Sequence, residues 1–171
     1  MDYLNQDHPV FRSSPARLAS AVNELLVCAL RCSQSFRLEF DGRRLERVIR
    51  PEAFRKLMPK LQRPESDART DSSPYDIYED LLDETKSEIL HRILSLAPEE
   101  GYDERPLNYI RSARLLDREG RTILRGGDRM EFILFALPEV ERAALSEAYC
   151  RDAIPAAAIE QVHVDVDRLR P

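Results

Sequence analysis

The chain has 171 residues, of which 43% are hydrophobic and 33% charged, and its formal net charge is −5. This length and composition fit a globular domain with its own core, and they exclude a chain that is disordered throughout. No apolar run approaches the roughly 18 residues of a membrane-spanning helix. The first residues lack the basic and apolar regions of a signal peptide, so we expect a cytoplasmic protein with no membrane partner.

The first element in chain order is a helix that begins after Ser14, a favourable N-cap residue, with Pro15 at the first helical position. Apolar side chains at helical spacing cover much of the helix circumference: Leu18, Val22, Leu25, Leu26, Ala29, Leu30 and Cys32. A helix of this kind is expected at the centre of the fold. The residues before it, His8 included, are expected to be frayed.

A β-hairpin is expected over residues 36–49, because polar and apolar residues alternate up to the turn-forming pair Asp41-Gly42. That turn places Leu38 opposite Leu45 and keeps the apolar residues on one face.

The next stretch combines helices with polar loops. A short helix begins at Pro51, and a stretch without large apolar side chains predicts a loop over about residues 63–74. Apolar residues at helical spacing then predict one long helix over 74–98. A second loop is expected over about 98–106.

Residues 107–137 have the pattern of a three-stranded meander, with turns expected at 117–120 and at Gly126-Gly127. Its last strand begins at Phe132 and is apolar on both faces, which is typical of a central strand covered on both sides.

The remaining elements complete the predicted fold. Pro138 favours the start of a helix over 138–150, a short helical piece follows, and a closing strand is expected over 162–167. Together the elements predict one α+β domain over residues 1–171, in which a mixed or antiparallel sheet packs with about four to five helices.

Charge is segregated along the chain. Residues 64–104 hold three basic and thirteen acidic side chains, whereas both predicted hairpins are rich in arginine. A basic surface attracts an anionic partner and an acidic surface a basic one. The candidates for binding an anionic partner are Arg43, Arg44, Arg47, Arg121 and Arg125. The candidates for binding a basic protein are Glu79, Asp80, Asp83 and Glu84, on the predicted long helix.

No catalytic residue, cofactor or metal site is assigned, because the dinucleotide, P-loop, zincin and nucleophile-elbow motifs are all absent. Cys28 and Cys32 lie in the apolar helix and are expected to pack as small apolar residues. The closing strand aligns His163, Asp165 and Asp167 on one face, about 7 Å apart at each step. That spacing is too wide for one metal to be held by all three, so the charged face of an edge strand is favoured.

The sequence therefore favours a non-catalytic protein-binding module: a regulator, adaptor, chaperone or neutralising partner that acts through charged and apolar surfaces. Self-association as a homodimer is a further expectation. The first alternative is nucleic-acid binding through the arginine-rich hairpins, although a pI of 5.3 is low for that class. The second alternative is a metal-dependent hydrolase that uses His163, Asp165 and the acidic helix.

Overall fold

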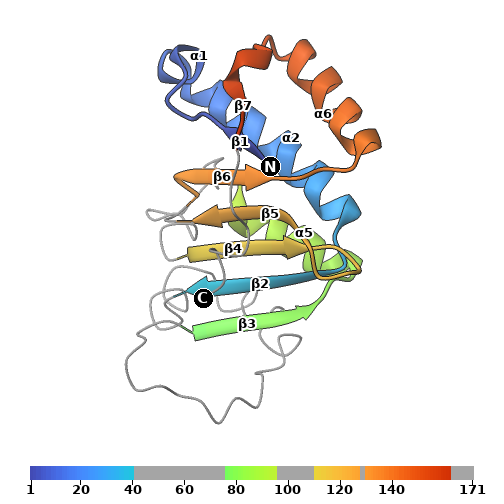
Figure 1. The fold of residues 1–171 in the computed structure, drawn as a ribbon. Coiled ribbons are helices and arrows are strands. Elements are labelled where there is room, and N and C mark those ends of the chain that lie inside the picture. The colour runs from blue at the N-terminus through green and yellow to red at the C-terminus, as the bar shows by residue number, and fades with distance from the viewer. Residues whose placement is uncertain (41–75, 96–109, 128–129, 163–171) are drawn as a thin grey trace.

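The computed structural model describes residues 1–40, 76–95, 110–127 and 130–162 (Figure 1). These residues form a seven-stranded sheet with the strand order β3-β2-β4-β5-β6-β1-β7, and every neighbouring pair is antiparallel. Helices pack against this sheet, so the expected α+β fold is confirmed.

The bounds of the elements are as follows. The strands are β1 (Asp2–Leu4), β2 (Ser35–Phe40), β3 (Asp76–Leu81), β4 (Ile110–Leu116), β5 (Thr122–Gly127), β6 (Phe132–Phe135) and β7 (Ile159–Gln161). The α-helices in the described ranges are α1 (Pro9–Arg12), α2 (Pro15–Cys32), α5 (Glu84–Leu94) and α6 (Glu139–Arg151), and Ala156–Ala158 form a 3₁₀ turn.

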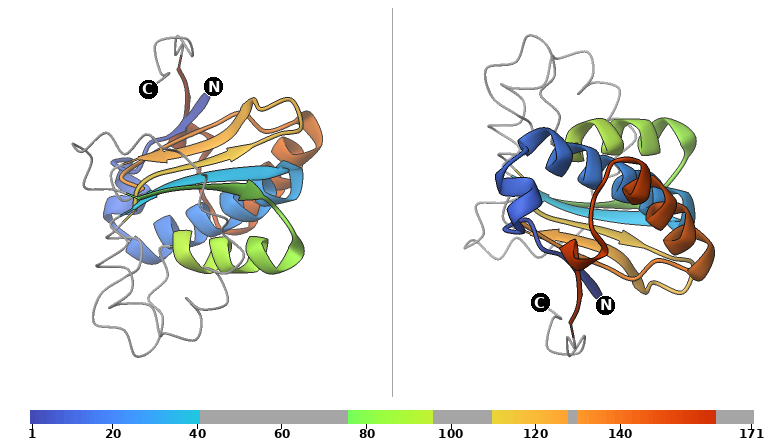
Figure 2. Two further views of the ribbon diagram at one scale, coloured as in Figure 1. Left: turned by 90° about the horizontal axis from the view of Figure 1, so that it is seen from below. Right: turned by 90° about the horizontal axis from the view of Figure 1, so that it is seen from above.

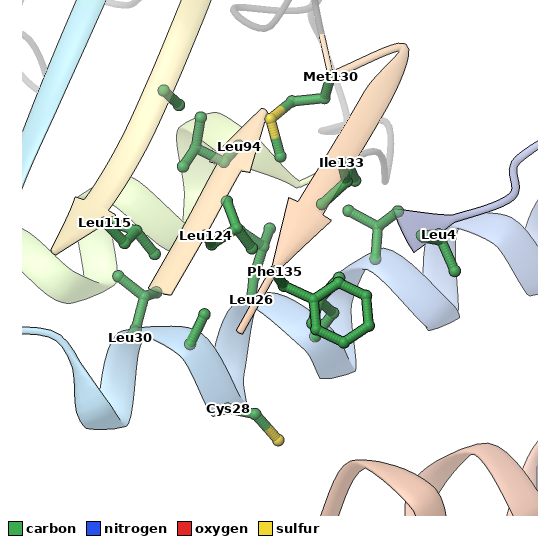
Figure 3. Close-up of a cluster of buried hydrophobic side chains, with 14 of the residues drawn as sticks. Leu4, Leu26, Cys28, Leu30, Leu94, Leu115, Leu124, Met130, Ile133 and Phe135 are labelled. Carbon is green, nitrogen blue, oxygen red and sulfur yellow. The ribbon is translucent and has the colours of Figure 1, made fainter. Parts of the chain in front are cut away.

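The core lies between one face of the sheet and the helices. Figure 2 shows α2 and α5 along this face, whereas no helix in the described ranges covers the opposite face. Apolar side chains at alternate positions of the strands point toward α2 (Figure 3), among them Leu115, Leu124 and Phe135. Leu26 of α2 is fully buried beneath them, so the prediction that the helix after Ser14 lies at the centre of the fold is confirmed.

The meander is confirmed as strands β4, β5 and β6, and the turn after β4 lies where it was predicted. The Asp117 amide donates to the Arg121 carbonyl at 2.9 Å, and Gly120 adopts a φ of 75°. The second predicted turn is wrong, because Gly126 and Gly127 belong to β5 and pair with both neighbouring strands.

These two glycines are needed for close packing rather than for a turn. A Cβ atom at Gly126 would lie 1.8 Å from the Met130 sulfur, and one at Gly127 would lie 2.1 Å from the Phe132 ring. Both neighbouring side chains fold back over the strand, and only glycine leaves them room.

The prediction for the partner of β2 is also wrong. Leu38 lies opposite Tyr78 of β3 on one side and Ala113 of β4 on the other, so no edge of β2 is left for Leu45. The rest of the predicted hairpin, the short helix from Pro51, and the two predicted loops lie outside the described residues.

The single long helix predicted over 74–98 is wrong in its first part, which is the strand β3. Tyr78 is buried between the exposed residues Ile77 and Glu79, and this alternation is that of a strand with one covered face. The helix α5 begins only after Asp83, whose side chain accepts a hydrogen bond from the Lys86 amide at 2.8 Å.

The N-terminus is not frayed. Strand β1 lies between β6 and β7, Leu4 is fully buried, and the Asp2 carboxylate lies 3.1 Å from the Arg142 guanidinium. His8 caps the short helix α1 by accepting a hydrogen bond from the Val10 amide at 3.3 Å.

The C-terminal elements agree with the prediction in kind. The helix over 138–150 is confirmed as α6, and the short helical piece as the 3₁₀ turn. The closing strand lies earlier than expected, because β7 spans Ile159–Gln161 and ends before the predicted range of 162–167. The Val162 amide donates to the Met1 carbonyl at 3.0 Å. Residues 163–167 of the predicted strand lie outside the described residues.

Helix α6 is followed by an alanine at the position that usually holds glycine. The Ile154 amide donates to the Tyr149 carbonyl and the Ala153 amide to the Cys150 carbonyl, which is the Schellman pattern. Ala153 adopts a φ of 53°, a left-handed conformation that favours glycine. Ala153→Gly is therefore expected to stabilise the fold by about 0.5–1 kcal/mol in urea unfolding. A loss of stability in this variant would contradict the strain inferred at Ala153.

Candidate functional site

Three arginines form a row across the face of the sheet that no described helix covers, called here the outer face. Arg37 of β2 lies opposite Arg114 of β4, and Arg114 lies opposite Arg125 of β5. Directly paired residues of antiparallel strands point to the same face, with Cβ atoms about 4.5–5.5 Å apart. Arg37, Arg114 and Arg125 are therefore adjacent, and we call them the arginine row.

The local sequence directs these side chains outward. Arg37 lies between the buried residues Phe36 and Leu38, and Arg114 lies between the buried residues Ala113 and Leu115. Because successive side chains of a strand alternate between the faces, an arginine between two core residues must point away from the core.

The row concentrates positive charge in a partly buried place. Burial lowers the pKa of Arg114, and the neighbouring charges of Arg125 and Arg37 lower it further, against the opposing charges of Glu39 and Glu79. Like charges that lie directly opposite each other destabilise a sheet. The three guanidinium groups therefore repel one another on the outer face, and the carboxylates of Glu39 and Glu79 offset part of this repulsion.

A carboxylate and apolar side chains border the row. On the β3 side, Arg37 forms an ion pair with Glu79, in which Nη1 of the guanidinium lies 2.8 Å from Oε1 of the carboxylate. On the other side, Arg125 lies opposite Leu134 of β6, which lies opposite Tyr3 of β1, and both of these side chains are half-buried. The outer face thus combines a cationic centre with an apolar flank.

The basic candidates predicted from the sequence are only partly brought together. Arg125 belongs to the row, whereas Arg121 lies in the exposed turn after β4 and pairs with Asp117 at 2.7 Å and Glu119 at 3.0 Å. The other three candidates, Arg43, Arg44 and Arg47, lie outside the described residues.

Arg37 and Arg114 are not among the candidate residues that the sequence indicates. Each is flanked by core residues in an alternating segment, and this local signal indicates an outward direction. Their adjacency depends on strand register, which the local pattern does not contain.

The acidic candidates do not share a helix face. Glu79 and Asp80 are neighbours on β3 and therefore point to opposite faces, Asp83 caps α5, and Glu84 is exposed in the first turn of α5. Asp80 lies 2.7 Å from the Lys86 ammonium. Glu79, Asp80 and Asp83 thus already form ion pairs or hydrogen bonds within the chain.

The described residues contain no group of three or more histidine, cysteine, aspartate or glutamate side chains that could hold a metal ion. His163, Asp165 and Asp167 lie outside those residues. Within the described part of the chain, no helix is both long enough and apolar enough to cross a membrane.

The thiols of α2 are poor nucleophiles. Burial, followed by the charge of Glu141, raises the pKa of Cys28, and the same two causes raise that of Cys32 to about 11. Only the thiolate is strongly nucleophilic, and at pH 8 a thiol with that pKa is ionised in roughly one molecule per thousand. These cysteines therefore fit the small apolar role expected from the sequence.

We expect Cys28 and Cys32 to react slowly with a disulfide reagent at pH 8 and the exposed Cys150 to react quickly. The Cys150→Ser variant should lose the fast phase, and two fast phases in the wild type would contradict this.

The folded-state pKa of Cys32 exceeds the ordinary value of 9.0, so the unfolded chain loses this proton first. The stability due to the neutral thiol is then present below about pH 9 and lost as the pH rises toward 11.

No protein-family model matches the chain, and neither a curated protein nor a solved structure matches it.

Proposed function

We propose that this chain is a non-catalytic protein-binding module that receives an acidic segment of a partner protein on its outer face. One observation carries the proposal: Arg37, Arg114 and Arg125 are in register on three adjacent strands, on the face that no described helix covers.

Arginine suits this role because its planar guanidinium donates two parallel hydrogen bonds to one carboxylate. Binding an anion also relieves the mutual repulsion of the three cations. Since the row is partly buried, salt screens its charges less than it screens fully exposed ones.

The apolar flank favours a protein as the partner. Leu134 and Tyr3 continue the row away from β3, and both retain partly exposed surface. Arginine and tyrosine are enriched at the centres of protein interfaces, where apolar contacts accompany charge pairs. The chain has a net charge of −5, so a local basic row can orient an acidic partner toward this face as it approaches.

Nucleic acid is the second candidate, and one observation favours it. The aromatic side chains of Phe132 and Tyr3 lie on the same face as the arginine row, and bases stack on such rings beside cations that pair with phosphates. The acidic net charge of the chain opposes this candidate.

The test is affinity capture from the native host with the tagged chain, followed by mass spectrometry. The variant Arg37→Gln/Arg125→Gln removes two charges from the row. The control Arg17→Gln/Arg151→Gln removes two exposed charges from α2 and α6. We expect the first variant to retain about one tenth or less of the partner, since each lost charged contact costs about 1.5 kcal/mol or more, and the control to retain nearly all of it.

Two results would contradict the proposal. One is equal loss of the partner in both variants, which would indicate a general effect of net charge. The other is retention that disappears when the lysate is treated with nuclease, which would favour the nucleic-acid candidate.

A further inference from the structure

Strand β3 is an edge of the sheet among the described residues, and its orientation shows which backbone groups face outward. The Leu82 amide donates to the Gln34 carbonyl at 2.8 Å, on the β2 side. In a trans peptide the carbonyl points opposite to the amide, so the Leu81 carbonyl faces away from β2. The alternation of an antiparallel strand then directs the backbone groups of Glu79 and Ile77 outward as well.

The outward groups of Leu81 are occupied by two neighbouring side chains. The Leu81 amide donates to Oδ1 of Asp80 at 2.7 Å, and the Leu81 carbonyl accepts from Nζ of Lys86 at 2.9 Å. Lys86 also donates to Oδ2 of Asp80 at 2.7 Å, and its residue is only 8% exposed. The two side chains thus take the place that a further strand would occupy beside Leu81.

The side chains of this strand would otherwise favour self-pairing. Ile77 and Leu81 are two of the three large hydrophobic residues that are exposed in the described part of the chain. If β3 paired with β3 of a second copy about Glu79, Ile77 of each chain would lie opposite Leu81 of the other. The two Glu79 carboxylates would face each other, and the ion pair of each with Arg37 of its own chain would offset part of their repulsion. Because of the two-fold symmetry, the contact between Ile77 of one copy and Leu81 of the other would occur twice, once at each end of the paired strands. Blocking Leu81 in both copies therefore prevents strand pairing at both ends.

We propose that Asp80 and Lys86 form an edge block that keeps β3 from pairing with β3 of a second copy of this chain. An open, partly apolar edge strand is a template for association, and occupying its outward hydrogen-bonding groups removes the template. The edge block is independent of the arginine row, which lies on the three strands beside β3.

The test replaces both members of the pair, because removing one charge alone would leave the other partly buried without its partner at 2.7 Å. The variant Asp80→Val/Lys86→Met frees the Leu81 amide and carbonyl. We expect its dimer dissociation constant, measured by sedimentation equilibrium, to be at least about tenfold lower than that of the wild type, the effect of one to two hydrogen bonds. Adding Ile77→Pro, which removes an outward-facing amide without breaking the bonds to β2, should restore the wild-type value.

Two results of the sedimentation experiment would overturn the proposal. One is a folded double variant that associates no more strongly than the wild type. The other is association that Ile77→Pro does not reverse. If the double variant does not fold, hydrogen exchange of the wild-type protein decides the question. The Leu81 amide should exchange at least about tenfold more slowly than the outward amides of Ile77 and Glu79, and equal rates would overturn the edge block.

Discussion

Phe135→Ala is expected to lower the free energy of unfolding by about 3–5 kcal/mol, the usual cost of truncating a large buried aromatic residue. Phe135 is 1% exposed on the inner strand β6, where it lies opposite Leu124 and Asp2. Its ring contributes to the layer between the sheet and α2 (Figure 3), and the rigid neighbouring strands limit how far the cavity can collapse. Urea unfolding, followed by circular dichroism, measures the loss.

Phe132→Ala is the matched control, because Phe132 lies on the same strand but is half-buried on the outer face. Removing a partly exposed ring should cost only about 1–2 kcal/mol. If both variants lose equal stability, the assignment of the core to the helix side of β6 is wrong.

Tyr3→Pro is expected to destabilise the fold by about 3 kcal/mol or more. Strand β1 is enclosed by β6 and β7, and Tyr3 lies opposite Leu134 on one side and Glu160 on the other. Every amide of an enclosed strand faces a neighbouring strand, so proline at this position removes a hydrogen bond of the ladder. The thermal unfolding midpoint and urea unfolding report the loss.

Tyr3→Val separates this backbone effect from the loss of the side chain. Valine keeps the amide and suits a strand, so it should cost about 1 kcal/mol. If proline and valine have the same effect, β1 does not hold the sheet together through its backbone, and the N-terminus is frayed as its sequence alone suggests.

The elements that could be predicted from the sequence are those with a strong local signal. The helix α2 has a continuous apolar stripe and a proline in its first turn, and β4 and β5 are joined by a turn with Asp117 and Gly120. Such signals act within a few residues, so no knowledge of the rest of the chain is needed.

The errors arise where distant segments decide the structure. Residues 76–81 fit a helical pattern, but as an edge strand they pair with β2 and bury Tyr78. Strand β1 has only three residues, and it is ordered by β6 and β7, which lie more than a hundred residues away. Tertiary pairing overrides local propensity in both cases.

In the candidate site, too, the local sequence predicts some features, whereas others depend on distant segments. That Arg37 and Arg114 point outward can be inferred from their core neighbours, whereas their alignment with Arg125 requires the register of three strands. The predicted long helix placed Asp80 and Lys86 on one continuous element. In the structure they belong to β3 and α5, and their contact closes the strand edge.

Photocrosslinking in the native host tests the proposed function most directly. A photoreactive phenylalanine derivative at Ser112, which lies on the outer face beside Arg114, should be captured by a protein, and the captured peptide should be rich in acidic residues. The same group at Ser146, exposed on α6, should give little or none of this product. Capture of the same partner from Ser146 alone, or capture of nucleic acid from Ser112, would contradict the binding of an acidic protein segment to the arginine row.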